Sequence, residues 1–92
     1  MHYTYVLLCS GKITKFYIGS CSDLIVRLKN HKTKSVQTTK KYDKIKLIYY
    51  EACLNKTDAR KREIQLKTGF GRGYLKRRLK EYLKRGISWA VQ

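Results

Sequence analysis

Phe16-Tyr17-Ile18-Gly19-Ser20 is the stretch of sequence that decides the fold, together with Ser22-Asp23-Leu24 directly after it. The first part has the aromatic and β-branched content of a strand and is closed by a glycine. Ser22 is a good helix N-cap, and a carboxylate at Asp23 would meet the positive end of the helix dipole. The stretch therefore predicts a strand over residues 16–20 and a helix from residue 22 to about His31.

Two polar side chains stand out on this predicted helix. Leu24 and Leu28 mark its core face, and Arg27 and His31 follow each other at the i to i+4 spacing beside that face. A polar group at such an edge is partly shielded and still reaches a ligand. Arg27 and His31 are therefore candidate site residues, although a solvated arginine and a histidine held by the helix dipole are the structural alternatives.

A second strand is predicted upstream, over residues 3–9, where aromatic and apolar residues alternate. Ser10-Gly11-Lys12 is typical of a turn, so residues 3–9 and 16–20 should form an antiparallel hairpin. Side chains alternate between the faces of a strand, so Tyr5 and Tyr17 share a face only if paired residue numbers add to an even sum. The site that we consider below requires this register.

The rest of the chain predicts one more strand and two helices. Residues 45–52 read as a strand, Asn55 caps a helix over residues 56–68 that Gly69 ends, and a last helix covers residues 73–84 before Gly86. Residues 32–44 read as a basic loop. The prediction is an α+β fold: one domain over residues 1–92, a three-stranded antiparallel sheet flanked by about three helices, and a short tail at residues 86–92.

The charge of the chain indicates its partner. Lysine and arginine number 22 against six acids, a formal net charge of +16 over 92 residues. Such a chain should bind a polyanion, and nucleic acid is favoured over a membrane because the basic residues are interleaved with tyrosine along the whole chain. No signal peptide follows Met1 and no apolar run reaches membrane-spanning length, so we expect a cytoplasmic protein.

Cysteine chemistry is not expected to hold the fold or a metal. Cys9, Cys21 and Cys53 are odd in number and have no CxxC spacing. We therefore expect three reduced thiols instead of disulfides or a zinc site.

Among the few acids, Glu63 is the one that helix position does not explain. It shares an i, i+4, i+7 stripe with Ala59 and Leu66, which points a carboxylate toward the apolar side of its helix. A buried charge needs a partner or a metal. The alternative is a solvated ion pair with Lys67, and Glu51 at the end of the third strand is the second candidate acid.

These residues, taken in order, resemble a known family. The sequence runs through Tyr5-Val6-Leu7, Tyr17-Ile18-Gly19, Arg27 with His31, Tyr49-Tyr50-Glu51 and Arg62-Glu63. This order is similar to that of the GIY-YIG nuclease superfamily, most of all its small stand-alone members related to the N-terminal catalytic domain of excinuclease C. The resemblance covers about residues 3–79. Tyr3-Thr4-Tyr5 stands in for the first motif, and no asparagine follows Glu63 to match the late one of larger relatives.

The resemblance implies a DNA endonuclease that hydrolyses a phosphodiester with one Mg²⁺ or Mn²⁺ ion. On this interpretation Tyr17 activates water directly or through a relay, Arg27 binds phosphate charge, and Glu63 is the sole protein ligand of the metal. Tyr5 orients the nucleophile or the phosphate, and His31 assists. One carboxylate suffices for a hard cation that keeps several waters, and arginine offers phosphate a planar two-point contact.

DNA binding is expected to use the abundant cations, which contact phosphates and carry little sequence information. We therefore expect DNA to be recognised by structure or backbone more than by sequence. The candidate residues are Lys29, Lys40, Lys41, Lys67, Arg72, Lys76, Arg77 and Lys80.

Two other functions stay open at this point. One is a catalytically inactive nucleic-acid-binding module of the same fold, and the other is a small basic protein that binds a ribosomal or acidic protein partner. A homodimer, the natural substrate and the pathway, DNA repair among others, are not determined by the sequence.

Overall fold

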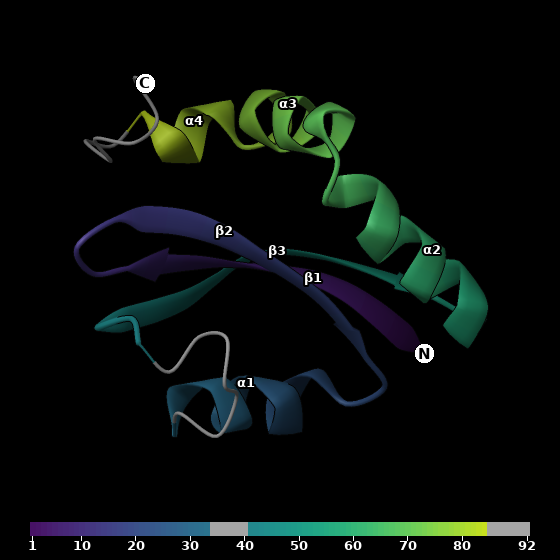
Figure 1. Cartoon of the computed structure of the whole chain (residues 1–92). Coiled ribbons are helices and arrows are strands. Elements are labelled where there is room, and N and C mark those ends of the chain that lie inside the picture. Colours follow the sequence, from purple (N-terminus) through teal and green to yellow (C-terminus); the bar gives the residue numbers. More distant parts are fainter. Residues whose placement is uncertain (34–40, 85–92) are drawn as a thin grey trace.

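The protein forms a three-stranded antiparallel sheet with helices on both faces (Figure 1). The computed structural model describes residues 1–33 and 41–84. The strands β1 (His2–Ser10), β2 (Thr14–Cys21) and β3 (Lys44–Cys53) lie in the order β2-β1-β3. The predicted fold class and element order are confirmed, and each strand is longer than its sequence pattern indicated.

The helices divide between the two faces of the sheet. Helix α1 (Leu24–Lys32) covers one face, and α2 (Lys56–Leu66), α3 (Gly69–Arg78) and α4 (Lys80–Leu83) lie on the other (Figure 1). The central strand β1 is buried from Thr4 to Cys9, because each face of it is covered by a helical layer. Strand β2 pairs with β1 alone among the described strands, so its other edge is free.

The register of the hairpin is the one that the candidate site requires. Tyr5 pairs with Gly19 and Leu7 pairs with Tyr17, and every pair of this ladder adds to an even sum. Tyr5 and Tyr17 therefore point to the same face, with ring centroids 6.3 Å apart. The sequence left this register open, and the structure meets the condition that the candidate site sets.

Alternation along the strands builds two hydrophobic cores. Tyr5, Leu7 and Cys9 pack with Leu24 and Leu28 of α1, as the sequence predicted for that helix. The intervening strand residues face the other helices, which contribute Leu66 and Leu75 to the second core. All three cysteines are free thiols, as expected.

The start of α1 differs from the prediction by one residue. The N-cap is Asp23 and not Ser22, and its Oδ1 accepts a hydrogen bond from the Val26 amide at 3.1 Å. Both residue types cap well, so the residue type does not decide between them. Asn55 caps α2 as predicted and accepts from the amides of Thr57 and Asp58.

The predicted end of α2 and the single last helix were wrong. Helix α2 ends at Leu66, and Gly69 is the first residue of α3 because the Thr68 hydroxyl accepts from the Gly71 amide and caps a new helix. The predicted helix over residues 73–84 breaks at Leu79, where φ is −107° and ψ is 21°. Leu75 and Leu83 are both buried, on either side of the break.

Several predictions lie outside the described residues. They are the middle of the predicted basic loop, residues 34–40, which includes Lys40, and the predicted end of the last helix at Gly86 with the tail that follows. Within residues 1–33 and 41–84, no helix is long and apolar enough to cross a membrane.

Close packing of α3 on α2 requires a glycine at position 71, which gives the first prediction. A Cβ atom there would overlap the backbone of Leu66, whereas a Cβ atom at Gly69 in the same helix would meet nothing within 4 Å. Gly71→Ala should lower the free energy of unfolding by about 3 kcal/mol or more, because backbone cannot yield as a side chain does. Urea unfolding followed by circular dichroism measures it.

Gly69→Ala is the matched control for this substitution. It should leave stability unchanged or raise it by less than about 1 kcal/mol, since alanine is the better helix former. Equal stability of the two variants would contradict the packing described for α3.

Candidate active site

Tyr5, Arg27 and His31 form a hydrogen-bonded cluster under α1. The Tyr5 hydroxyl lies 2.9 Å from His31 Nε2, and Arg27 Nε donates to the same hydroxyl at 3.1 Å. Tyr5 and His31 are fully buried. Because Arg27 donates to the oxygen, Tyr5 is free to donate its own proton to His31.

The position of Tyr5 depends on a glycine in β2. A Cβ atom at Gly19 would lie 2.5 Å from the Tyr5 hydroxyl, so only glycine leaves room for the ring to cross over this strand. Helix α1 then supplies Arg27 and His31 from successive turns, since both project from the side that meets the ring. The predicted i to i+4 pair is thus brought onto one tyrosine oxygen.

Burial sets the protonation states of this cluster. It raises the pKa of Tyr5 to about 12 against the opposing effect of Arg27, so the phenol keeps its proton at neutral pH. Burial, with the positive charge of Arg27, lowers the pKa of His31 to about 4. The imidazole is therefore neutral, and the alternative of a histidinium held by the helix dipole is wrong. The hydrogen bond to Tyr5 raises the pKa of Arg27, which stays charged.

Tyr17 is the partly exposed member of the group. Its ring centroid lies 5.0 Å from that of His31, edge to face, on the same side of the sheet as Tyr5. Unlike Tyr5, Tyr17 is only half-buried, because it lies on the edge strand β2. Water and ligands therefore reach Tyr17 more easily than Tyr5.

Glu63 is buried on the opposite face of the sheet. It is 4% exposed and lies with Ala59 and Leu66 on the inward stripe of α2, as the sequence predicted. Its Oε1 accepts from Ser20 Oγ at 2.7 Å and from Arg60 Nη1 at 2.9 Å. Its Oε2 accepts from Lys67 Nζ at 2.6 Å and again from Arg60. The pair with Lys67 exists, but the carboxylate is not solvated.

The carboxylate of Glu63 is ionised at neutral pH. Burial by itself would raise the pKa of Glu63, and the hydrogen bonds from Lys67, Ser20 and Arg60 outweigh it and lower the pKa below its usual value. Ser20 and Arg60 were not predicted as site residues. The alternation of Ser20 with Gly19 and the i to i+3 spacing of Arg60 to Glu63 are the signals that point to them.

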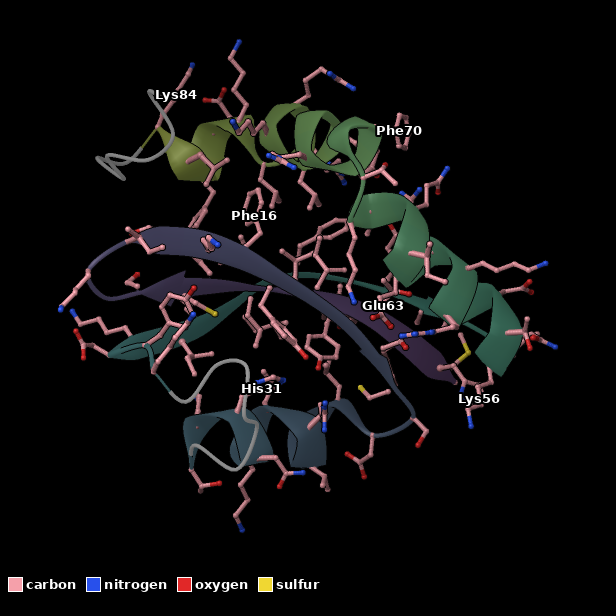
Figure 2. All side chains as sticks on the ribbon, in the orientation of Figure 1. Phe16, His31, Lys56, Glu63, Phe70 and Lys84 are labelled. Carbon is pink, nitrogen blue, oxygen red and sulfur yellow. The ribbon has the colours of Figure 1, made fainter. Side chains whose placement is uncertain are left out.

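The two groups meet at one strand. Figure 2 shows Glu63 between α2 and the sheet and His31 between α1 and the sheet. Consecutive residues of β2 contact them, since Gly19 lies against Tyr5 and Ser20 donates to Glu63. The free edge of β2 therefore carries a cationic and phenolic group on one side and a carboxylate on the other.

Two clefts follow this edge. One, of about 720 Å³, is lined by residues 20–23, by Arg27 from α1 and by Lys56, Ala59 and Arg60 from α2. The other, of about 500 Å³, is lined by residues 14–18, by Lys67 and by Arg72 and Lys76 of α3. Both have cationic walls, so both suit an extended polyanion.

The structure distributes the predicted DNA-binding residues unevenly. Lys67, Arg72 and Lys76 share the second cleft. The other described candidates line neither cleft and are exposed; they are Lys29, Lys41, Arg77 and Lys80.

Glu51, the second candidate acid, has a structural role. Arg62 donates to both of its oxygens at 2.9 Å, and the Tyr49 hydroxyl donates at 2.8 Å. This network joins β3 to α2, and Tyr74 extends it to α3 through a 3.1 Å contact with the Tyr49 hydroxyl. The network fixes α2 on the sheet and thereby the place of Glu63.

Metal binding at this site would use a single carboxylate. Within the described part of the chain, no three histidine, cysteine, aspartate or glutamate side chains gather as a metal group. An ionised carboxylate is nevertheless a ligand that Mg²⁺ and Mn²⁺ accept, with water and phosphate completing the shell. The site can therefore hold a hard cation at Glu63 after Lys67 or Arg60 moves away from a carboxylate oxygen.

The buried neutral His31 predicts a pH dependence of stability. Its pKa is about 4 in the fold, below the ordinary ~6.5, so the unfolded chain binds the extra proton between these values. Stability is therefore fully present above about pH 6.5 and is lost as the pH falls, by about 2 kcal/mol between pH 7 and 5. Urea unfolding at several pH values measures the slope.

His2, the second of the two histidines, supplies the control. His31→Asn should remove the slope between pH 7 and 5, whereas His2→Asn should keep it. A slope that survives in His31→Asn would contradict the buried neutral imidazole.

Comparison with known families gives one match. The family described as the GIY-YIG catalytic domain matches residues 1–77 of the 92-residue chain. This range includes β1, β2, α1, β3, α2 and all but the last residue of α3. The comparisons with curated proteins and with solved structures found no match.

Proposed function

The chain belongs to the GIY-YIG family, and from this premise we propose that it is a metal-dependent endonuclease that hydrolyses phosphodiester bonds of DNA. One observation carries the proposal. A buried ionised carboxylate and a tyrosine, arginine and histidine cluster contact consecutive residues of a single free strand edge. A phosphate on that edge has the carboxylate on one side and Arg27 on the other.

Arg27 is assigned to the phosphate. Its charge is permanent, its Nε donates to Tyr5, which restricts the orientation of the guanidinium, and the residue lines the cleft of residues 20–23. A fixed planar cation stabilises the charge that develops on phosphate oxygens in the transition state.

The two tyrosines have different tasks in the proposed site. Tyr17 is half-buried on the edge strand and its ring lies beside His31, so we assign it the activation of the attacking water, directly or through a relay. Tyr5 is buried and keeps its proton at neutral pH, so we assign it no role as a base; it accepts from Arg27 and shares a hydrogen bond with His31. Neutral His31 helps to orient the cluster through this hydrogen bond.

Glu63 is the residue that would hold the metal, Mg²⁺ or Mn²⁺. When bound, such an ion supplies Lewis-acid stabilisation of phosphate charge and activation of a water. The pKa of Glu63 lies below its ordinary value, so the ligand is available without loss of a proton.

DNA is proposed as the substrate because both clefts have cationic walls. Arginine and lysine side chains contact phosphate oxygens, which are alike at every base pair. We therefore expect selection by the shape or structure of DNA, with little discrimination among sequences. The cytoplasmic location, the single domain over residues 1–92 and the relation to excinuclease C stay predictions.

Nicking of supercoiled plasmid tests the function. The purified chain should convert the plasmid to open circles with Mg²⁺ or Mn²⁺, and a chelator should stop it. Glu63→Gln, Tyr17→Phe and Arg27→Ala should each lower the rate by about 100-fold or more, because each removes a group that acts on the reacting phosphate. Gel electrophoresis over time gives the rates.

Glu81→Gln is the matched control, since it removes a carboxylate that is 84% exposed in α4. It should nick like the parent. A chain that binds plasmid with metal present but never nicks it would be an inactive binding module, and the proposal would fail. Full activity in Glu63→Gln would overturn the site.

Salt dependence tests the mode of DNA binding. The logarithm of the affinity should fall linearly with the logarithm of the salt concentration, and Arg72→Ala should reduce the slope by about 1 because one phosphate contact is lost. Lys61→Ala removes an exposed charge of α2 that lines neither cleft and should change the slope less. Fluorescence anisotropy with a short duplex measures both. Equal changes of the slope in Arg72→Ala and Lys61→Ala would show that DNA does not bind along the cleft of residues 14–18.

A further inference from the structure

The carboxylate that is to hold the metal already has its oxygens occupied. Lys67 Nζ lies 2.6 Å from Oε2 of Glu63, and Arg60 Nη1 lies 2.9 Å from each oxygen. Ser20 Oγ adds a further donor to Oε1 at 2.7 Å. A hard cation needs at least one of these oxygens at close range. An ammonium or a guanidinium must therefore leave before a metal ion enters.

The acid and its cations differ in mobility. The Glu63 side chain is 5% exposed, whereas those of Lys67 and Arg60 are 52% and 62% exposed. The long basic side chains can turn into solvent, but the buried carboxylate would then keep Ser20 as a donor without a compensating cation. This is unfavourable unless another cation replaces them.

Each of the two cations lines a different cleft. Lys67 lies in the cleft of residues 14–18 with Arg72 and Lys76. Arg60 lies in the cleft of residues 20–23 with Arg27. A DNA backbone along the free edge of β2 therefore brings phosphates to both Lys67 and Arg60 at once, on either side of Glu63.

We propose that Lys67 and Arg60 are positioning residues that make metal binding at Glu63 depend on bound DNA. In the free protein they occupy the carboxylate. Backbone phosphates in the two clefts draw them away, and the oxygens of Glu63 become available to Mg²⁺ or Mn²⁺. Metal and DNA then bind more tightly together than alone, by the same factor in each direction. This inference rests on the proposed function and adds the order in which the site is completed.

Binding of Mn²⁺ alone to the DNA-free chain tests the first half. The electron paramagnetic resonance signal of free Mn²⁺ gives the affinity. Lys67→Met keeps an unbranched apolar stem and removes the ammonium, so it should bind Mn²⁺ about fivefold more tightly or better than the parent. Lys61→Met, which replaces an exposed lysine of α2, should bind like the parent. Equal affinities in the two variants overturn the inference.

The effect of Mn²⁺ on DNA binding tests the second half of the inference, that metal and DNA bind more tightly together. Fluorescence anisotropy measures the affinity for a short duplex with and without Mn²⁺ at constant ionic strength. A gel checks that the duplex stays intact. Glu63→Gln lacks the metal ligand, so it shows how much Mn²⁺ changes DNA binding by screening charges alone. Relative to that variant, Mn²⁺ should tighten DNA binding by the parent about fivefold or more, and less in Lys67→Met. An identical response of the parent and Glu63→Gln overturns the inference.

The same titrations separate this inference from the proposed function. If Glu63→Gln binds Mn²⁺ as tightly as the parent, the metal assignment under the proposed function fails. If Mn²⁺ binding requires Glu63 but is the same with and without the Lys67 ammonium, the inference alone fails.

Discussion

The alternation of side chains along β2 is the constraint on which the proposed site depends. Gly19 leaves room for the Tyr5 ring on one face, and Ser20 donates to Glu63 on the other. Helices α1 and α2 pack on opposite faces of the sheet, and both thereby contribute side chains to the same strand edge. A slip of one residue in the hairpin would place Tyr5 and Tyr17 on opposite faces of the sheet.

Burial gives the two halves of the site opposite electrostatic characters. Under α1 it keeps Tyr5 protonated and His31 neutral, so Arg27 is the only charged member of that cluster. Under α2 the carboxylate of Glu63 stays charged, because two basic side chains and a hydroxyl compensate its burial. The edge of β2 thus lies between a fixed positive charge and a fixed negative charge, which suits a phosphate that is joined to a metal ion.

Much of this arrangement could be predicted from the sequence, and the reasons differ by feature. The inward stripe of Ala59, Glu63 and Leu66 followed from helical spacing, whereas the register of the hairpin stayed open because the loop length was not determined. The helix ends could not be predicted as well, because Asp23 and Ser22 are equally good caps and Thr68 starts a helix that Gly69 was expected to end. The partners of Glu63 depend on how α2 docks on β2, and no local pattern reports that docking.

The central claim is that groups from both faces of the sheet act on one phosphate at the edge of β2. A crystal structure of the chain with Mn²⁺ and a short DNA, with anomalous data to locate the ion, tests it most directly. We expect an anomalous peak at the Glu63 carboxylate and a backbone phosphate that contacts both this ion and Arg27. An ion bound at Glu51, or a phosphate out of reach of Arg27, would contradict it.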